Sequence, residues 1–171
     1  MRRHIVAVTV TAALLAVAGC SNPSKYAMPG DVCGAPVPPS ALEPLLLPGE
    51  KLEQSTALSR PGAAHCFVQV DKETVLSVQG EVIPAGTDPS VRREWQVHGA
   101  TKIDVGDAAL VSDINVVAVA PCVYEGANRR FVVQVERFYP NRDDAAKRRE
   151  ALTHFMTAYF PAAKKAAGCT S

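Results

Sequence analysis

The sequence predicts an α+β fold: an antiparallel sheet of four to six strands, a short N-terminal helix, and a long C-terminal helix packed on one face. Segments rich in β-branched residues, such as 116–124, occupy the middle of the chain between turn signals. Near the C-terminus, four apolar residues recur at the i, i+3, i+4, i+7 spacing of one helix face: Leu152, Phe155, Met156 and Tyr159. Strands followed by one long amphipathic helix favour a sheet that the helix covers.

The N-terminus, residues 1–19, predicts a secretory signal peptide. Arg2 and Arg3 precede an uncharged segment, 5–18, that is shorter than the about 20 residues a helix needs to cross a bilayer. The segment ends in Ala18-Gly19-Cys20, which resembles the bacterial lipobox. The resemblance implies a diacylglycerol on the Cys20 thiol and cleavage before that residue. The alternative is an ordinary signal peptide with an accidental cysteine.

Domain organisation follows from this leader. We expect the lipidated cysteine and a tether over 20–32, then a single α+β domain over 33–171, since the length fits one domain. The lipid would hold the protein on the outer face of the cell membrane, which makes the membrane its first partner. Without the leader the chain carries 16 basic against 17 acidic residues. This balance argues against a nucleic-acid partner, because no basic excess is available to neutralise phosphates.

Four cysteines remain after Cys20: Cys33, Cys66, Cys122 and Cys169. An even number in an exported domain predicts two disulfides, for which three pairings exist. The long gaps lack the C-x-x-C spacing of zinc sites, so we expect no metal and no cofactor. We favour the pairs Cys33–Cys66 and Cys122–Cys169, which tie each element to a sequence neighbour. Chain-entropy reasoning gives each bridge about 4 kcal/mol of stabilisation.

The elements of the first half are a short helix and a hairpin. Ser40-Ala41-Leu42-Glu43 matches the capping box and predicts a short helix that Pro48-Gly49 ends. The segment Ala64–Val70 alternates, with Cys66, Val68 and Val70 on one face. Asp71-Lys72-Glu73 turns the chain into a second strand, Thr74–Ile83, and the two strands predict an antiparallel hairpin.

The second half begins with an ambiguous segment, 91–98, which fits a short helix or a strand. Asp104–Asp107 predicts a turn, followed by strands over 109–111 and 116–124. A turn at Gly126-Ala127-Asn128 leads to the alternating segment Phe131–Phe138, and these last two strands predict a second hairpin.

The final helix has clear predicted ends. Asn141–Asp144 supplies acidic residues near its positive N-terminus. Pro161 predicts a kink or an interruption, and Gly168 predicts the stop.

The order of these elements carries a family resemblance. Cys33 stands before the first short helix, Cys66 lies in the first strand, and Gly106-Asp107-Ala108-Ala109 enters a later strand. This pattern resembles small secreted lipoproteins of actinobacteria, a family of unknown function that is similar to extracellular sensor domains of receptor kinases of that phylum. The resemblance covers Cys33–Phe160. It implies no catalytic residues, and Cys122 and Cys169 depart from it.

One mixed cluster is a candidate ligand site: Arg92, Arg93, Trp95 and His98. An arginine pair beside an aromatic ring can bind an anionic or sugar-like molecule by charge-assisted hydrogen bonds and stacking. The alternative is a tryptophan that anchors a helix to the sheet, with arginines that reach the solvent.

Other polar residues predict solvated surface. Asp104, Asp107 and Asp113 lie within ten residues of each other but do not match a calcium loop. Arg129 and Arg130 flank a predicted hairpin turn, where we expect solvent or membrane phosphates around them. The motifs of serine hydrolases, zinc peptidases and P-loop nucleotide-binding proteins are missing from the sequence, so we expect no catalytic residues.

Three functions fit these observations. The first is a non-catalytic ligand-binding or sensor-like module that holds a small or lipidic molecule in a groove between sheet and helix. The second is an accessory interaction protein of a cell-envelope or membrane complex, which predicts an exposed apolar patch. The third is an envelope hydrolase, which predicts a pocket with clustered titratable groups.

Overall fold

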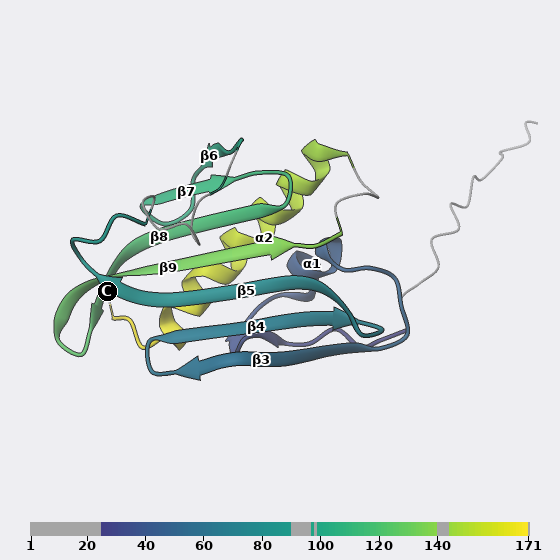
Figure 1. Ribbon diagram of the computed structural model, residues 1–171, viewed down its shortest axis with the longest axis horizontal. Helices are drawn as coiled ribbons and strands as arrows, with labels where there is room; N and C mark the ends of the chain where they lie inside the picture. Colours follow the sequence, from purple (N-terminus) through teal and green to yellow (C-terminus); the bar gives the residue numbers. More distant parts are fainter. Residues whose placement is uncertain (1–24, 90–96, 98, 140–143, 171) are drawn as a thin grey trace, which may run out of the picture.

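The computed structural model describes residues 25–89, 97, 99–139 and 144–170. It has the α+β fold that the sequence predicts, with a seven-stranded antiparallel sheet in the order β3-β4-β5-β9-β8-β7-β6 (Figure 1). The elements in chain order are β1 (Asp31–Val32), β2 (Ala35–Pro36), α1 (Pro39–Leu42), the 3-10 helix η1 (Glu43–Leu45), β3 (Leu52–Arg60), β4 (Ala63–Val70), β5 (Glu73–Pro84), β6 (Thr101–Ile103), β7 (Ala108–Val111), β8 (Asn115–Tyr124), β9 (Ala127–Arg137) and α2 (Ala145–Ala166).

The two predicted hairpins form the centre of the sheet. Strands β4 and β5 pair around a turn at Asp71-Lys72, and β8 pairs with β9 around Glu125-Gly126, slightly earlier than predicted. The hairpins are joined by a long-range ladder between β5 and β9, in which Val78 lies opposite Val135. This pairing places the last strand of the chain at the middle of the sheet.

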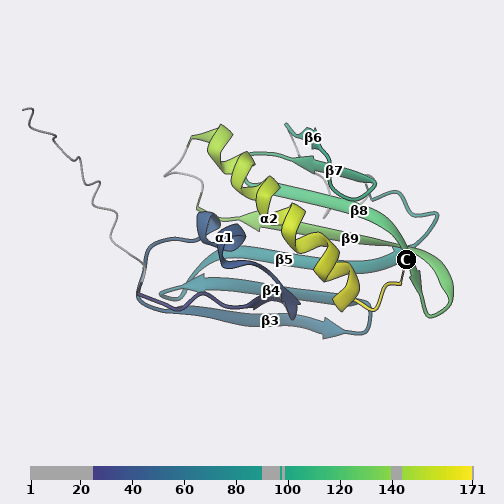
Figure 2. The same ribbon diagram turned by 180° about the vertical axis from the view of Figure 1, so that it is seen from behind.

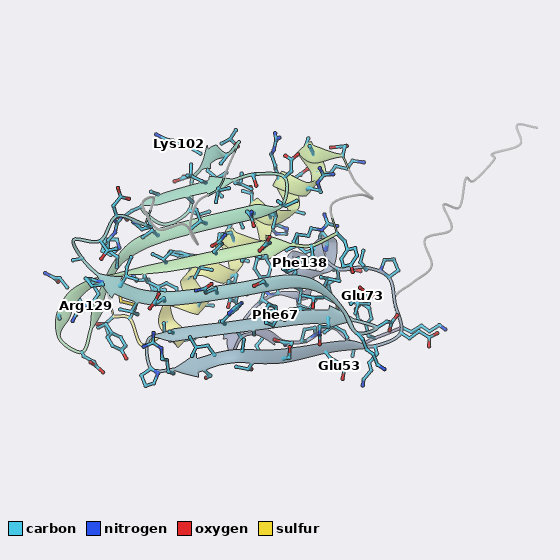
Figure 3. All side chains as sticks on the ribbon, viewed as in Figure 1. Glu53, Phe67, Glu73, Lys102, Arg129 and Phe138 are labelled. Carbon is cyan, nitrogen blue, oxygen red and sulfur yellow. A yellow bond between two sulfur atoms is a disulfide. The ribbon has the colours of Figure 1, made fainter. Side chains whose placement is uncertain are left out.

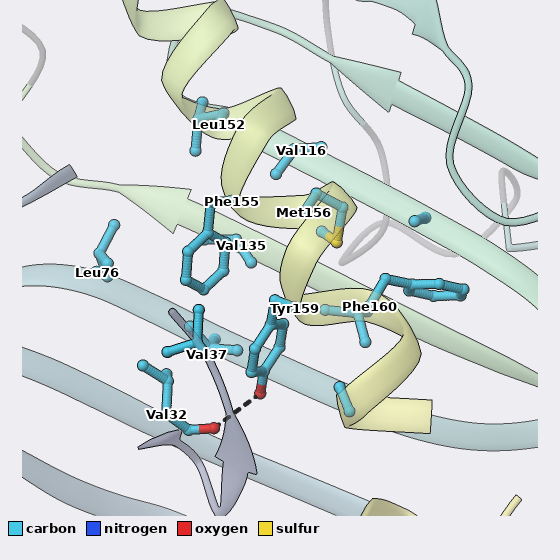
Figure 4. Packing of buried hydrophobic residues seen from close by; sticks show 14 of the residues in the cluster. Val32, Val37, Leu76, Val116, Val135, Leu152, Phe155, Met156, Tyr159 and Phe160 are labelled. Atoms are coloured by element: carbon cyan, nitrogen blue, oxygen red, sulfur yellow. Dashed lines mark hydrogen bonds between the residues drawn. The ribbon is translucent and has the colours of Figure 1, made fainter. Parts of the chain in front are cut away.

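One face of the sheet is covered by α2, by α1 and by the small hairpin β1–β2 (Figure 2). The predicted apolar stripe of α2 is fully buried against the sheet, as Figure 4 shows, and Phe155 stacks on Tyr159 with ring centroids 5.0 Å apart. The Tyr159 hydroxyl donates a hydrogen bond to the Val32 carbonyl, 3.1 Å away. The helix therefore holds the β1–β2 hairpin as well as the sheet.

Alternation along the strands sets which side chains enter this core. Cys66, Val68 and Val70 are buried on the helix-covered face, as the sequence predicts. On β5, Leu76 and Val78 are buried and Val82 is partly exposed.

Two strands of the sheet were not expected. β3 is an edge strand whose side chains are mostly exposed, with an irregular register between Thr56 and Leu58. Because it buries little apolar surface, it has no hydrophobic alternation for a sequence pattern to detect. β6, at the other edge, has three residues and, among the described strands, pairs with β7 alone.

The predicted capping box at Ser40 is wrong. The N-cap of α1 is Pro38, which makes no side-chain capping bond, and Ser40 lies inside the helix. Two consecutive prolines start this helix because their restricted φ angle fits its first turn. The helix then has a single turn before η1 continues it.

The ends of α2 follow the sequence prediction, but the helix does not stop at Pro161. Asp144 is the N-cap and accepts a hydrogen bond from the Lys147 amide at 2.9 Å, while 141–143 lie outside the described residues. Gly168 ends the helix with φ +84°. The predicted interruption at Pro161 does not occur, because Pro161 faces solvent, where water can satisfy the carbonyl that loses its helical partner.

Both favoured disulfides are present. Cys33–Cys66 joins the β1–β2 hairpin to β4, and Cys122–Cys169 joins β8 to the end of α2, with Cα–Cα distances of 5.6 and 5.2 Å. Disulfides persist in oxidising compartments and thus indicate an extracytoplasmic protein. In the part of the chain that the structure describes, no helix has the length and apolarity to cross a membrane.

Gly106 is required where the chain turns from β6 into β7. Its φ is +62°, and a Cβ at this position would lie 2.6 Å from the Val119 carbonyl oxygen and 3.0 Å from the Phe160 ring. The next residue, Asp107, donates its amide to the same Val119 carbonyl at 2.9 Å. Glycine thus allows the turn to pack directly onto β8.

Candidate functional site

In the part of the chain that the structure describes, no helix covers the face of the sheet opposite α2 (Figure 1). The side chains of this face divide it into two parts. The part over β4 and β5 is polar. His65 lies opposite Gln79 in the ladder, and its Nε2 is 2.9 Å from the Ser77 hydroxyl. The His65 and Phe67 rings are in tilted contact, with centroids 4.8 Å apart. These side chains are partly exposed, which suits a surface in contact with water.

The other part of this face is apolar. Ile83, Val117, Val119 and Val132, from β5, β8 and β9, form a second buried cluster that is separate from the main core. Val97 and Leu110 pack against it. Valine occupies successive positions 116–117 and 132–133, so these strands are apolar on both faces rather than on one.

A cavity of about 580 Å³ lies over this apolar cluster. Its floor is formed by Leu110, Val117 and Val119, and Pro89 and Val97 contribute to its wall. The volume falls in the range of about 300–1,000 Å³ that is typical of small-molecule sites. Strand order brings these residues together, since β7 and β8 are neighbours, and Pro89 and Val97, which follow β5 in the chain, lie on the same face.

Charged side chains of both signs also line the cavity: Asp88, Lys102, Asp107 and Arg130. Arg130 is partly buried, and its Nη1 donates a hydrogen bond to the Thr87 carbonyl at 3.3 Å. The two carboxylates and the lysine are exposed. Of the two cations, the partly buried Arg130 guanidinium should bind an anion more strongly than the exposed lysine, because water screens it less and it offers five N–H donors.

The predicted cluster Arg92, Arg93, Trp95 and His98 lies outside the described residues, as does Cys20. Pro89 and Val97, which line the cavity, are the nearest described residues on either side of 90–96.

Arg130 was expected to be solvated beside a turn, but it is partly buried at the cavity. Its position on β9, two residues before Val132, places both side chains on the same face. The pattern alone did not reveal that this face is apolar near β8. Arg129, in contrast, is exposed as expected.

The three aspartates do not form a site together. Asp113 accepts from Arg149 at 2.6 Å and from Arg148 at 3.4 Å, which joins the start of α2 to the turn between β7 and β8. Asp104 and Asp107 are exposed. Within the described ranges, no three His, Cys, Asp or Glu side chains are placed to hold a metal ion.

Among the described residues, three groups have shifted pKa values, and none of these three lines the cavity. Burial raises the pKa of Tyr159 above its ordinary value. The hydrogen bond to Glu73 raises the pKa of Tyr139, and the hydrogen bond from the Lys147 amide lowers the pKa of Asp144. These shifts therefore belong to the core and to the surface, not to the cavity.

A smaller hollow of about 410 Å³ lies between the sheet and the end of α2, where the sequence placed a ligand groove. Gly80 and Phe131 line its sheet side, and Tyr159 and Ala163 line its helix side. Phe131 lies close above Gly80 and contacts Phe160, with ring centroids 5.8 Å apart, so aromatic rings fill much of this interface. The cavity on the opposite face is larger and has the more apolar lining.

Comparison of the chain with protein-family models, with curated proteins and with solved structures finds no match.

Proposed function

We propose that the protein is a lipid-anchored, extracytoplasmic binding module, without catalytic activity, that holds a small amphiphilic anion in the cavity over β7 and β8. The observation that carries the proposal is this cavity, with its valine and leucine floor and one partly buried guanidinium. The lipid anchor is supported by the lipobox-like sequence at Cys20.

The occupant follows from the lining. Leu110, Val117 and Val119 present aliphatic surface that favours an acyl chain or a similar apolar body. Arg130 lies at one end of this surface, opposite Pro121 and Ile83 in its two ladders. A carboxylate or phosphate at that end would form charge-assisted hydrogen bonds with the guanidinium.

Calorimetric titration of the protein with dodecanoate, and with dodecanol as the uncharged analogue, tests this proposal. We expect saturable binding of dodecanoate with one site per chain. Arg130→Gln should weaken dodecanoate at least about tenfold, the equivalent of one charge-assisted hydrogen bond, and leave dodecanol nearly unchanged. Leu110→Gln should weaken both molecules, because it makes the shared apolar floor polar.

Two matched control variants test whether the effect is specific to Arg130. Lys102→Gln removes the exposed cation of the same cavity and should have a much smaller effect than Arg130→Gln. His65→Gln changes the polar part of the same face and should change neither affinity. The proposal fails if neither molecule binds saturably, or if Arg130→Gln and His65→Gln have equal effects.

A further inference from the structure

The chain enters the domain at one end of the sheet, and its contacts there are firm. The Lys25 amide donates to the Gly49 carbonyl at 2.9 Å, and the Lys25 ammonium lies 2.6 Å from the Glu50 carboxylate. The Tyr26 hydroxyl donates to the Leu47 carbonyl at 2.6 Å, and the Tyr26 and Met28 side chains pack against the core. These contacts attach residues 25–28 to the domain, within the segment 20–32 that was expected to be a tether.

We call this part of the surface the tether end: Lys25, 49–51, 71–73 and 138–139. Its loops are bonded to each other. The Asp71 amide donates to the Lys51 carbonyl at 2.8 Å, and the Asp71 carboxylate accepts from the Lys51 amide at 2.8 Å. Phe138 donates its amide to Val75 at 3.1 Å, and the Tyr139 hydroxyl donates to the Glu73 carboxylate. These bonds connect the loops of the tether end into one continuous surface, on the side of Glu53, Glu73 and Phe138 in Figure 3.

Only five residue steps separate Cys20 from Lys25. Fully extended, they span at most about 18 Å. A lipid on Cys20 would hold that residue at the membrane surface, so Lys25 would lie within this distance of the headgroups. The far end, at Arg129, lies nine residues along the chain from Phe138, about 30 Å away in an extended strand.

We propose that the tether end is a membrane-facing surface that rests against the lipid headgroups, with Phe138 as its apolar contact. This inference rests on the lipid anchor proposed above. Phe138 is 43% exposed, and it is one of two large hydrophobic side chains that the described residues leave exposed. Aromatic side chains are favoured at a headgroup boundary, where an apolar ring can leave water.

The charges of the tether end decide which kind of membrane it fits. Lys51 lies 2.8 Å from Glu53, and Lys25 is paired with Glu50, so these cations are largely balanced by carboxylates. Asp71 and Glu73 also offset Lys72. Such a balanced surface needs no anionic lipid, and its contact with a zwitterionic bilayer should be nearly insensitive to salt.

This orientation would place the ligand cavity above the membrane. Along β9, Gln134 is paired with Val117, and it lies four residues from Phe138, about 13 Å. Arg130 lies eight residues from Phe138, about 26 Å. The anion-binding end of the cavity would then face the surrounding medium, and the ligand would enter from there rather than directly from the bilayer.

Fluorescence quenching by brominated lipids tests the orientation. The full chain is produced with its leader, the mass of Cys20 lipidation is verified, and the protein is reconstituted in phosphatidylcholine vesicles with and without brominated acyl chains. In a Trp95→Phe background, Phe138→Trp and Arg129→Trp place the sole tryptophan at opposite ends of β9. We expect brominated lipid to reduce the fluorescence of Phe138→Trp at least about twofold, because the ring enters the headgroup boundary, and to leave Arg129→Trp unchanged.

A second measurement uses the unaltered sequence. Lysine acylation by a water-soluble reagent is compared between vesicle-bound protein and protein lacking the lipid. We expect Lys72 to be acylated several-fold more slowly on vesicles, and Lys165, near the far end of α2, to be acylated at the same rate.

The outcomes separate the two proposals. A chain without lipid on Cys20 overturns both the anchor and the orientation. A lipidated chain in which both tryptophans are quenched equally, or in which Arg129→Trp is quenched more, overturns the orientation alone. Equal protection of Lys72 and Lys165 leads to the same conclusion. Neither result affects the dodecanoate titration, which depends on the cavity.

Discussion

The two faces of the sheet differ in what covers them, although the same strands form both. On the helix-covered face, Val116, Val133 and Val135 are fully buried beneath α2. On the opposite face, the buried apolar residues are limited to one part of the surface, and polar side chains such as Gln79 and Gln134 occupy the rest. The comparison indicates that the first face forms the main core of the fold. The second face carries additional apolar side chains that strand pairing does not require.

That excess is what makes the second face a candidate site. A sheet face that met only water would be expected to alternate with polar residues at positions such as 117, 119 and 132. The presence of valines there has a cost in solvation unless something covers them. In the structure these side chains are largely buried, Val97 and Leu110 pack against them, and the cavity borders Val117 and Val119.

Val116 and Val117 allow the sharpest test, because they are successive residues of β8 on opposite faces. Val116→Ala should lower the free energy of unfolding by about 2–3 kcal/mol, from lost burial and a remaining cavity in the main core. Val117→Ala should lower it by about 1 kcal/mol or less, because its side chain already borders a cavity. Urea unfolding followed by circular dichroism measures both.

For the same two variants, we expect the effects on ligand affinity to have the reverse order of the effects on stability. Val117→Ala should weaken dodecanoate, and Val116→Ala should leave its affinity unchanged in protein that remains folded. If the two variants lost equal stability and had equal affinities for dodecanoate, the proposal that one face stabilises the fold and the other binds the ligand would be contradicted.

Gly106 packs against the Val119 carbonyl on β8 and the Phe160 ring on α2. Its substitution should therefore affect both faces of the sheet. In Gly106→Ala the new Cβ would meet the Val119 carbonyl, in a backbone conformation that L-residues rarely adopt. We expect a loss of about 1–3 kcal/mol in the free energy of unfolding. Because Asp107 and Val119 line the cavity, dodecanoate affinity should fall as well.

Gly99→Ala is the matched control for Gly106. Gly99 also has a positive φ, +64°, but open space surrounds its Cβ position. If the two variants were equally destabilised, backbone strain alone would account for the effect, and close packing on β8 would contribute nothing.

Tyr159 tests the helix-covered face through pH. Burial raises its pKa, so the folded protein keeps the hydroxyl protonated while the unfolded chain ionises above about pH 10. The stabilisation of the folded state by the protonated Tyr159 hydroxyl is therefore complete below pH 10 and is lost as the pH rises further. Tyr159→Phe should cost about 1 kcal/mol at pH 7, from the lost hydrogen bond to Val32, and should flatten the decline of stability above pH 10.

The control for this measurement is Tyr139→Phe. The Tyr139 hydroxyl is bonded to Glu73 at the surface, where its pKa is also raised, but solvent screens it. This variant should retain most of the alkaline decline. A wild-type-like decline in Tyr159→Phe would show that burial of this hydroxyl does not control stability at high pH.

The sequence by itself determined the parts of the fold that follow from local periodicity. Alternation in Ala64–Val70 and Phe131–Phe138 specified two strands, and the stripe Leu152–Tyr159 specified the buried side of α2. The favoured cysteine pairs were also correct, and each joins two cysteines that are consecutive along the chain. These features are predictable because burial on one face imposes a repeat of two or 3.6 residues.

Only the tertiary structure decided the rest. β3 became the edge strand although its residues carry no alternation, and α2 continued through Pro161 because that residue faces solvent. The cavity joins Pro89, Val97, 102–103, 107–110, 117–119 and Arg130, which the chain order keeps far apart. They meet because β9 pairs with both β5 and β8, and such long-range pairing depends on the packing of the whole sheet rather than on any local pattern.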